Sequence, residues 1–307
     1  MSVPFSLTIL GSGGALPVSG KFPSSQFLQI GSSGFLIDAG EGVQIQLMKL
    51  GISNHRIHHV FISHLHGDHY LGLMGLLFSM HLSARKQELN IHSHTGLDEI
   101  ILTQLRYAGS VLGFPVHFKH LKAGVSEEII QQEDLIVSTI PLKHRVPCSG
   151  FLFKEKQGPF RIIKEKIPKE MLIQQILKLK AGEDVRDENG KILFPLNEFT
   201  LPPHRQRSYA YCSDTAPDDH VVQHINGVDL LYHEATFSSA DSIRAAETFH
   251  STAEQAATIA AKAKVGELLI GHFSARYKNS SILLDEAREI FEKTRIANEG
   301  NIFEINI

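Results

Sequence analysis

One short segment constrains this chain more than any other feature of its sequence. Three histidines and an aspartate fall within six residues, His64-Leu65-His66-Gly67-Asp68-His69. The residues before it, Val60-Phe61-Ile62-Ser63, have the apolar character of a short buried strand. The stretch Leu71 to Leu82 that follows has the apolar spacing of a helix. We therefore predict that the segment is a loop between a strand and a helix.

The residue types in this segment are those that bind transition metals. His64 and His66 are two apart in an extended stretch, so their rings can point the same way. Gly67 lets the chain turn before Asp68 and His69. Imidazoles and carboxylates suit zinc and, less selectively, manganese or iron. A lone histidine in such a place is commonly a core or surface residue, but this density of ligands indicates a metal site.

Six residues are too few to fill two coordination spheres, so distant ligands are needed. Three candidates lie at the ends of predicted strands: His144, Asp214 and His272. Because strand ends converge on one edge of a sheet in α/β proteins, we expect these side chains to meet the His64–His69 segment there. Taken one at a time, each could instead be a capped strand end or a surface histidine.

The rest of the chain is predicted to form an α/β fold, because strands are followed by helices. The expected strands are Phe5–Leu10, Gln26–Ile30, Gly34–Asp38, Leu89–His92, Val116–His120, Tyr209–Cys212, Val228–Tyr232 and Glu267–Ile270. The expected helices are Val43–Leu50, Leu97–Ala108, Thr252–Ala263 and Ser281–Lys293. Ser251 and Glu254 have the spacing of a capping box. The Gly11–Gly14 loop lacks the third glycine of a dinucleotide fingerprint, since Leu16 holds that position, and is interpreted as a close turn.

Composition limits the class of protein and its partners. The 307 residues fit one large α/β domain, residues 1–307, and 42% apolar residues allow a substantial core. No apolar run approaches the ~18 residues of a membrane span, and Met1 to Leu10 lacks the pattern of a secretory signal. The cysteines, Cys148 and Cys212, form no disulfide framework, so a cytoplasmic location is expected. With a net charge of −3, any nucleic acid must be held by a local patch or by bound metal.

Residues 154–207 differ from the rest of the chain. Between 154 and 191, ten Lys or Arg are interleaved with seven Asp or Glu, and Gly158-Pro159 and residues 187–190 are turn signals. Met171–Leu179 could form one short helix. We predict an insertion that projects from the core, and a solvated surface excursion is the alternative.

The motifs, taken in order along nearly the whole chain, resemble the metallo-β-lactamase superfamily and, within it, the ribonuclease Z family of tRNA 3′-processing endonucleases. The His64–His69 segment alone marks only the superfamily. The elements that narrow the resemblance are His233-Glu234-Ala235-Thr236, His250-Ser251-Thr252 and His272-Phe273-Ser274-Ala275-Arg276-Tyr277. Leu36–Gly42, Pro141–Pro147 and Cys212–Thr215 continue it.

The resemblance implies an αβ/βα sandwich with the site at one edge and two zinc ions per chain. One ion would be held by His64, His66 and His144 and the other by Asp68, His69 and His272, with Asp214 as the bridge. The family cuts precursor tRNA after the discriminator base and leaves a 3′-hydroxyl on the tRNA. The resemblance also implies that the protein is a homodimer.

Catalytic roles can be assigned on this basis. Two metal ions ~3.5–4 Å apart activate water and neutralise a phosphodiester. Asp68 is the general-base candidate, because it can touch both metal and water. His250 precedes a capped helix whose dipole favours phosphate, and it is expected to protonate the leaving group or stabilise the phosphate. Glu234 is a candidate to orient a histidine. Arg276 could contact a phosphate or form a structural ion pair.

The resemblance also implies that residues 154–207 form an arm that grips tRNA away from the site. The family's Gly-Pro element is not evident at Pro168–Leu172, but Lys178–Val185 resembles the basic stretch that follows it, which makes Lys178 and Lys180 candidates for substrate binding. The Pro17–Pro23 loop lacks the basic-asparagine ending of many members, which leaves discrimination against tRNA carrying CCA open.

Two other functions are compatible with the same motifs. A dinuclear phosphodiesterase could act on small or cyclic phosphodiesters. A closed, uncharged pocket would favour this function, whereas a basic surface aligned with the arm would favour RNA. A binding protein could use the metals only structurally, but structural zinc sites are usually closed and cysteine-rich.

Overall fold

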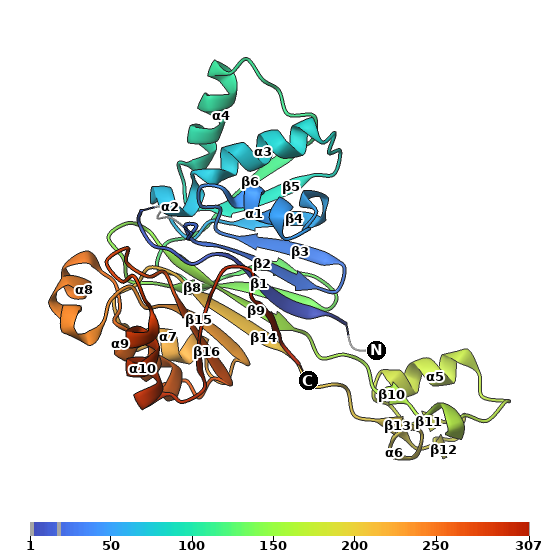
Figure 1. The fold of residues 1–307 in the computed structure, drawn as a ribbon. Coiled ribbons are helices and arrows are strands. Elements are labelled where there is room, and N and C mark those ends of the chain that lie inside the picture. Colours follow the sequence, from blue (N-terminus) through green and yellow to red (C-terminus); the bar gives the residue numbers. More distant parts are fainter. Residues whose placement is uncertain (1–2, 17–19, 307) are drawn as a thin grey trace.

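Two seven-stranded sheets pack face to face in the computed structural model, which describes residues 3–16 and 20–306 (Figure 1). The first sheet has the order β18-β1-β2-β3-β4-β5-β6 and the second β17-β16-β15-β14-β9-β8-β7. The strands of the first sheet are β1 (Phe5–Gly11), β2 (Ser25–Ile30), β3 (Ser33–Ile37), β4 (Ile57–Phe61), β5 (Leu89–Ser93), β6 (Val116–His120) and β18 (Ile302–Glu304). Those of the second are β7 (Glu128–Gln131), β8 (Leu135–Pro141), β9 (Ser149–Glu155), β14 (Ser208–Cys212), β15 (Leu230–Glu234), β16 (Glu267–Gly271) and β17 (Thr294–Ile296).

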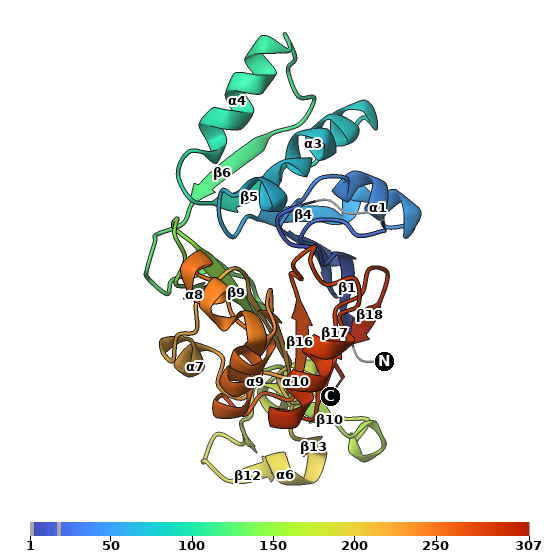
Figure 2. The same cartoon turned by 60° about the vertical axis from the view of Figure 1, so that its left-hand side comes forward.

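Helices cover the outer face of each sheet, which completes the αβ/βα sandwich predicted from the sequence (Figures 1 and 2). The first sheet carries α1 (Val43–Lys49), α2 (Gly67–Tyr70), α3 (Gly72–Leu82) and α4 (Leu97–Tyr107). The second carries α7 (His220–His224), α8 (Ser242–Thr248), α9 (Ala253–Lys262) and α10 (Ser281–Ile290). Among the described residues, no helix has the length and apolar character needed to cross a membrane.

The interior between the sheets is built from large apolar side chains that alternate along the strands, with Phe35, Phe61 and Phe153 at its centre. Two histidines, His59 and His92, lie among these rings. The ring of His92 stacks on Phe61 with centroids 4.7 Å apart, and its Nε2 is 3.1 Å from Nδ1 of His59. Burial lowers the pKa of His59 to about 4 and that of His92 to about 3, so both are neutral near pH 7.

Local differences from the sequence prediction have identifiable causes. The strand before the histidine segment ends at Phe61, and the second half of the segment forms the single turn of α2, so Asp68 and His69 are helical rather than in a loop. The backbone of His66 is extended and its carbonyl accepts the N–H of His69, which starts this turn. The capping box of α9 uses Thr252 and Gln255, one residue later than predicted, because the hydroxyl of Ser251 donates to a distant carbonyl instead.

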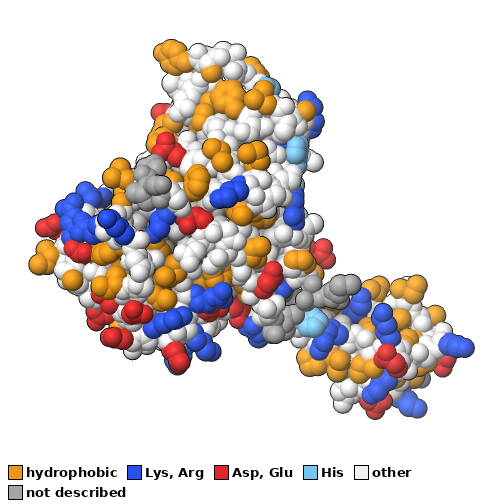
Figure 3. Space-filling model, viewed as in Figure 1, with side chains coloured by type: hydrophobic (Ala, Val, Ile, Leu, Met, Phe, Trp, Pro, Cys, Tyr) orange, Lys and Arg blue, Asp and Glu red, His pale blue; other side chains and the backbone are white. Residues whose placement is uncertain are grey.

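Residues 156–206 leave the sandwich between β9 and β14 and form a small projecting arm (Figure 1). It contains β10 (Arg161–Ile162), α5 (Ile173–Lys180), β11 (Val185–Arg186), β12 (Ile192–Phe194), α6 (Leu196–Phe199) and β13 (Thr200–Leu201). Met171, Leu179 and Val185 are its buried apolar residues, and they form a cluster separate from those of the sandwich. Figure 3 shows lysines and arginines spread over the visible face of the arm.

Candidate active site

The predicted metal ligands meet at one edge of the sandwich, where four strands end. The His64–His69 segment follows β4, His144 follows β8, Asp214 follows β14 and His272 follows β16. Since β3–β5 and β14–β16 run parallel within their sheets, their carboxyl ends reach the same edge. The side chains of His64, His69, Asp214 and His272 are almost completely buried there.

Four donor atoms form the first group. Nε2 of His64 is 3.0 Å from Nδ1 of His66, which is 3.2 Å from Nε2 of His144. Oδ2 of Asp214 lies 3.6 Å from Nε2 of His64 and 3.9 Å from Nε2 of His144. The four atoms therefore face one common point.

The second group shares Asp214 with the first. Oδ2 of Asp68 is 3.4 Å from Nε2 of His69 and 3.3 Å from Nε2 of His272. Oδ1 of Asp214 is 3.3 Å from Nε2 of His69 and 3.2 Å from Nε2 of His272. The two oxygens of Asp214 thus point into different groups, which is the geometry a bridging carboxylate requires.

The donor sets fit metal ions. Nitrogen and oxygen ligands ~2.1 Å from a tetrahedral ion are ~3.4 Å from one another, close to the spacings in both groups. Burial lowers the pKa of His64, which keeps its ring neutral and able to ligate. Burial also opposes a charge on His69, yet Asp214, Asp68 and Asp38 around it outweigh this and raise its pKa. The cluster carries an excess of negative charge that a cation would balance.

Each buried ligand ring is anchored at its second nitrogen, which fixes the nitrogen left for the cluster. The anchors are Ser63 Oγ for His64 at 3.0 Å, Asp38 Oδ2 for His69 at 2.7 Å, the Phe249 carbonyl for His144 at 3.0 Å and Thr236 Oγ1 for His272 at 2.9 Å. None of these four was assigned a role from the sequence. Signals were present for three of them, because Asp38 and Ser63 end predicted strands and Thr236 lies in the His233–Thr236 motif.

Asp38 joins the two sheets at this edge. Its carboxylate accepts the backbone N–H of Ser63 at 2.7 Å and the hydroxyl of Tyr211, on β14 of the other sheet, also at 2.7 Å. Its φ of 56° places it in the left-handed region, which aspartate tolerates better than most residues. The carboxylate is completely buried, and these contacts satisfy its charge.

His250 is held by Glu234, and together with Asp214 and His272 it forms a third set of potential donor atoms. Its Nδ1 is 2.9 Å from Oε1 of Glu234, and its Nε2 is 3.9 Å from Oδ2 of Asp214. Burial alone lowers the pKa of His250, but the carboxylate of Glu234 and then that of Asp214 outweigh it and raise the pKa to about 9. Glu234 is fully buried and also accepts the backbone N–H groups of Thr215 and Ser251, so it holds one orientation. The arrangement keeps Nε2 of His250 directed at the cluster.

Asp68 is bound on one oxygen only. Its Oδ2 accepts the N–H of Ala15 at 2.7 Å and faces His69 and His272, whereas Oδ1 has no hydrogen-bond partner among the described residues. Burial raises the pKa of Asp68, but the two histidines outweigh it and hold the pKa well below its usual range. The loop that supplies Ala15 needs Gly14, because a Cβ there would lie 2.7 Å from the ring of His272.

The remaining candidates lie away from the cluster. Arg276 pairs with Asp241 at 2.9 Å and lies over the ring of Phe237, which is the structural ion pair considered above. Lys178 and Lys180 are exposed on α5 of the arm. The Pro17–Pro23 loop includes residues 17–19, which lie outside the described residues.

Comparisons with known proteins agree with this geometry. A family model described as anti-Pycsar protein Apyc1 matches residues 5–156. Ribonuclease Z of Phocaeicola vulgatus is 46% identical over 296 residues, which cover 96% of this chain and 96% of the relative. This chain belongs to the ribonuclease Z family. It is accordingly a hydrolytic nuclease that acts on phosphodiester bonds and depends on metal, and the family predicted from the motifs is confirmed.

Solved structures support the same assignment. The short form of human tRNase Z (ELAC1) superimposes with a TM-score of 0.72 at 26% identity, over 98% of this chain and 100% of that one. The metallo-β-lactamase fold protein YhfI of Bacillus subtilis gives a TM-score of 0.70 at 18% identity, over 99% of this chain and 100% of that one. The second likeness concerns the fold alone, and with the first it confirms the predicted metallo-β-lactamase-like sandwich.

Proposed function

We propose that this ribonuclease Z family member is a zinc-dependent endoribonuclease that removes the 3′ trailer from precursor tRNA and leaves a 3′-hydroxyl on the tRNA. The observation that carries the proposal is that Asp214 belongs to the first donor group and also contacts His69 and His272 of the second, at 3.3 and 3.2 Å, at the sandwich edge. Membership of the ribonuclease Z family supplies the substrate. The cysteines, Cys148 and Cys212, are buried and form no disulfide, which is compatible with a cytoplasmic enzyme.

In this proposal two Zn²⁺ ions occupy the cluster, and Mn²⁺ is the substitute the ligands would accept. The first ion is assigned His64, His66 and His144, the second Asp68, His69 and His272, and Asp214 serves both. When bound, the pair supplies Lewis-acid stabilisation of the phosphodiester and lowers the pKa of water.

The chain's own residues orient the reactants and move the protons. Asp68 uses its unpartnered Oδ1 to orient the attacking water and accept a proton from it, while Oδ2 stays fixed by Ala15. His250 presents Nε2 to the leaving oxygen and donates a proton to it. Glu234 acts through His250, because its hydrogen bond to Nδ1 stabilises the protonated ring.

Substrate binding is assigned to surfaces outside the cluster. Lys178 and Lys180 of the arm are the candidate phosphate contacts, whereas Arg276 would have to leave its ion pair with Asp241 to become one. A homodimer, which the family resemblance implies, is part of this proposal. The helices of the first sheet leave apolar side chains exposed that such a dimer could bury, with Met48 of α1 75% exposed, Leu82 of α3 81% and Tyr107 of α4 83%.

The decisive experiment incubates the zinc-loaded protein with a precursor tRNA and maps the product ends. The proposal expects a single cut after the discriminator base, with a 3′-hydroxyl on the tRNA and the trailer released. Cleavage of a small chromogenic phosphodiester without cleavage of the precursor would instead favour a small-molecule phosphodiesterase. Folded, metal-loaded protein inactive on both substrates would contradict the proposal.

A variant separates the role of His250 from metal binding. His250→Ala should keep the metal content of the wild type and lose roughly 10²–10⁴-fold in cleavage, the scale for a general acid. Thr252→Val, two residues on at the helix cap, serves as the control for a local folding defect. Loss of zinc from His250→Ala, measured by elemental analysis, would make His250 a ligand and overturn its assigned role.

A further inference from the structure

A second concave site lies where the arm joins the sandwich, far from the metal-binding edge. It is a cavity of about 400 Å³, within the size range of small-ligand sites. Arg207 at its base precedes β14, whereas Asp214 follows the same strand, so the two sites lie at opposite ends of β14, roughly 20 Å apart. Of the residues that line it, only Lys180 is also a candidate substrate contact in the proposed function.

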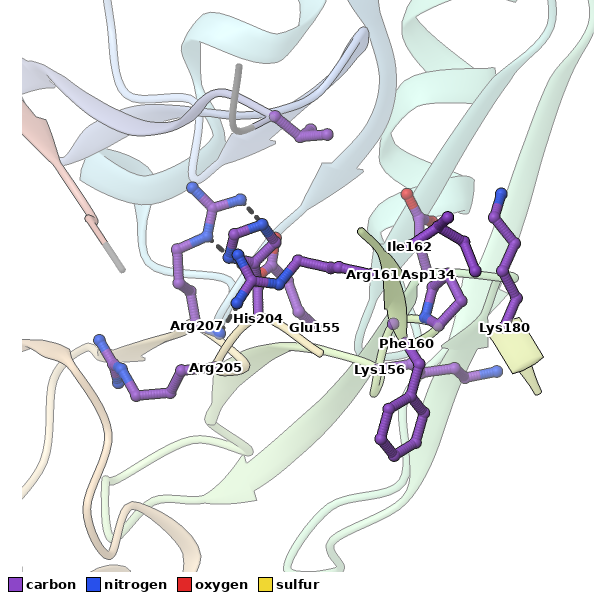
Figure 4. Close-up of a pocket in the computed structure, with 13 residues that line it drawn as sticks. Asp134, Glu155, Lys156, Phe160, Arg161, Ile162, Lys180, His204, Arg205 and Arg207 are labelled. Atoms are coloured by element: carbon purple, nitrogen blue, oxygen red, sulfur yellow. Dashed lines mark hydrogen bonds and ion pairs between the residues drawn. The ribbon is translucent and has the colours of Figure 1, made fainter. Parts of the chain in front are cut away.

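The cavity is lined from both sides of the junction. Figure 4 shows Phe160, Arg161, Ile162 and Lys180 of the arm near Glu155 and Arg207 of the sandwich. Lys156, His204 and Arg205 come from the two chain segments that connect the arm to the sandwich. A ligand in the cavity would therefore touch the arm and the sandwich together.

Part of the charge in this cavity is used by the protein itself. Arg207 is buried and binds Glu155 through Nε at 2.9 Å and Nη2 at 2.5 Å, so this pair forms a neutral, fixed floor. Arg205 pairs with Asp229, which lies outside the cavity lining. Neither arginine needs a ligand to balance its charge.

Three other cations have no such partner. Lys156 and Lys180 make no ion pair among the described residues, and Arg161 uses only Nε, which donates to the carbonyl of Pro202 at 2.8 Å. Both terminal nitrogens of Arg161 are left free of protein hydrogen bonds among those residues. Among the described residues, Asp134 is the one other carboxylate in the lining, so their side chains give the cavity an excess of positive charge.

We infer that this junction cavity is a binding site for phosphate groups. A guanidinium with two free terminal nitrogens suits the oxygens of a phosphate, and two flanking ammonium groups balance its charge. The apolar wall formed by Phe160 and Ile162 lowers the local dielectric and strengthens the attraction. The phosphate can belong to the backbone of an RNA or to a free phosphorylated metabolite, since both offer the same oxygens.

A bound phosphate would also fix the direction of the arm. The arm has its own small apolar cluster, and two chain segments connect it to the sandwich. Arg161 and Lys180 belong to the arm, and Lys156 to the segment that leaves β9. An anion bound by all three would bridge the two parts and oppose their mutual repulsion.

Lysine footprinting on the zinc-loaded protein tests the inference with a control inside the same molecule. The protein is acetylated at fixed ionic strength with increasing inorganic phosphate, and each lysine is quantified by mass spectrometry. Lys156 and Lys180 should become protected, while Lys164 and Lys169, exposed on the arm outside the cavity, should not. The metal-binding edge cannot produce this signal, because it contains neither of the protected lysines.

A variant and a second probe complete the test. Arg161→Gln should raise the phosphate concentration for half-protection about tenfold, the scale for losing a charge-assisted hydrogen bond, and Lys164→Gln should leave it unchanged. Protection by precursor tRNA as well as by phosphate would assign the site to RNA backbone. Protection by phosphate alone would assign it to a free phosphorylated metabolite. If neither probe protects Lys156 and Lys180 more than Lys164, the inference is wrong.

Discussion

The metal-binding edge and the arm use polar side chains in opposite ways. At the edge, His64, His69 and Asp214 are buried and held in fixed orientations by further hydrogen bonds. In the arm, the lysines are exposed, and even Ile173, at 77% exposure, faces solvent. Only the first arrangement has the preorganisation that chemistry requires. The second offers a wide charged surface, which suits long-range attraction of a polyanion and tolerates change.

The largest effect is expected where both donor groups depend on one residue. Asp214→Ala should reduce bound zinc from close to two ions per chain to less than one and reduce phosphodiester cleavage to background. Removing this carboxylate takes one ligand from each group. Elemental analysis and both cleavage assays check the result, with Asp285→Ala, an exposed acid on α10, as the control. If the variant kept full metal content and full activity, Asp214 would not be a ligand shared by the two donor groups.

Excising the arm should separate the contribution of the metal-binding edge to cleavage from the contribution of the arm to tRNA binding. Replacing residues 158–203 with a short glycine–serine linker is geometrically simple, because β9 and β14 are antiparallel neighbours and the Glu155–Arg207 pair would close the hairpin. Cleavage of a small phosphodiester should persist, while kcat/KM for precursor tRNA should fall roughly 10²-fold or more as phosphate contacts are lost.

The salt dependence provides an internal check on this variant. Each lost contact between a cation and a phosphate should flatten the log–log salt slope by roughly one. If both activities collapse together, the arm is part of the folding core. If neither changes, tRNA is bound elsewhere.

A smaller effect on metal affinity is expected from changing Asp38, which holds the ligand ring of His69 in its orientation. Asp38→Asn keeps the size of the side chain and suits its left-handed backbone, but it places an amide among four donor groups from Ser63, His69 and Tyr211. We expect metal affinity to fall by roughly 10–100-fold, the usual scale for a residue that orients a ligand. Competition with a fluorescent zinc chelator measures this. Asp187→Asn in a turn of the arm is the matched control and should bind zinc like the wild type.

The smallest effect concerns the acid sensitivity of the sandwich. Because burial lowers the folded pKa of His59 and His92, the unfolded chain takes up protons first as pH falls below 6.5. The stability they contribute is fully present above that pH and is lost between pH 6.5 and their folded values. Each should account for about 1–2 kcal/mol between pH 7 and 5.

The double variant His59→Gln, His92→Gln should flatten this dependence, measured by urea unfolding at several pH values. The arm-excised protein should keep the slope of the wild type, because both histidines lie between the sheets. An unchanged slope in the double variant would assign the acid sensitivity to other groups.

The sequence predicted the fold class and every side chain of the two donor groups, because ligands at strand ends leave a local pattern. It placed His144 at the end of a predicted strand without giving that strand bounds, and it did not predict β9, since the pairing of β8 with β9 depends on tertiary partners. The turn of α2 was missed because Gly67 was taken as a loop residue. The anchors Thr236 and Phe249 were missed because their function comes from tertiary contacts, and for Phe249 from a backbone carbonyl that any residue could supply.

Strand β14 connects the arm junction to the metal-binding edge and fixes the distance between them. It lies between β9 and β15 in the middle of its sheet, with hydrogen bonds along both sides, so it neither stretches nor slides. Arg207 at one end and Asp214 at the other therefore keep a constant separation, whatever the arm encounters. We therefore expect a swing of the arm to be taken up by the two connecting segments, residues 156–159 and 202–206, and not to be transmitted to the catalytic edge. The strand acts as a rigid spacer that lets one part of the enzyme move while the other stays aligned.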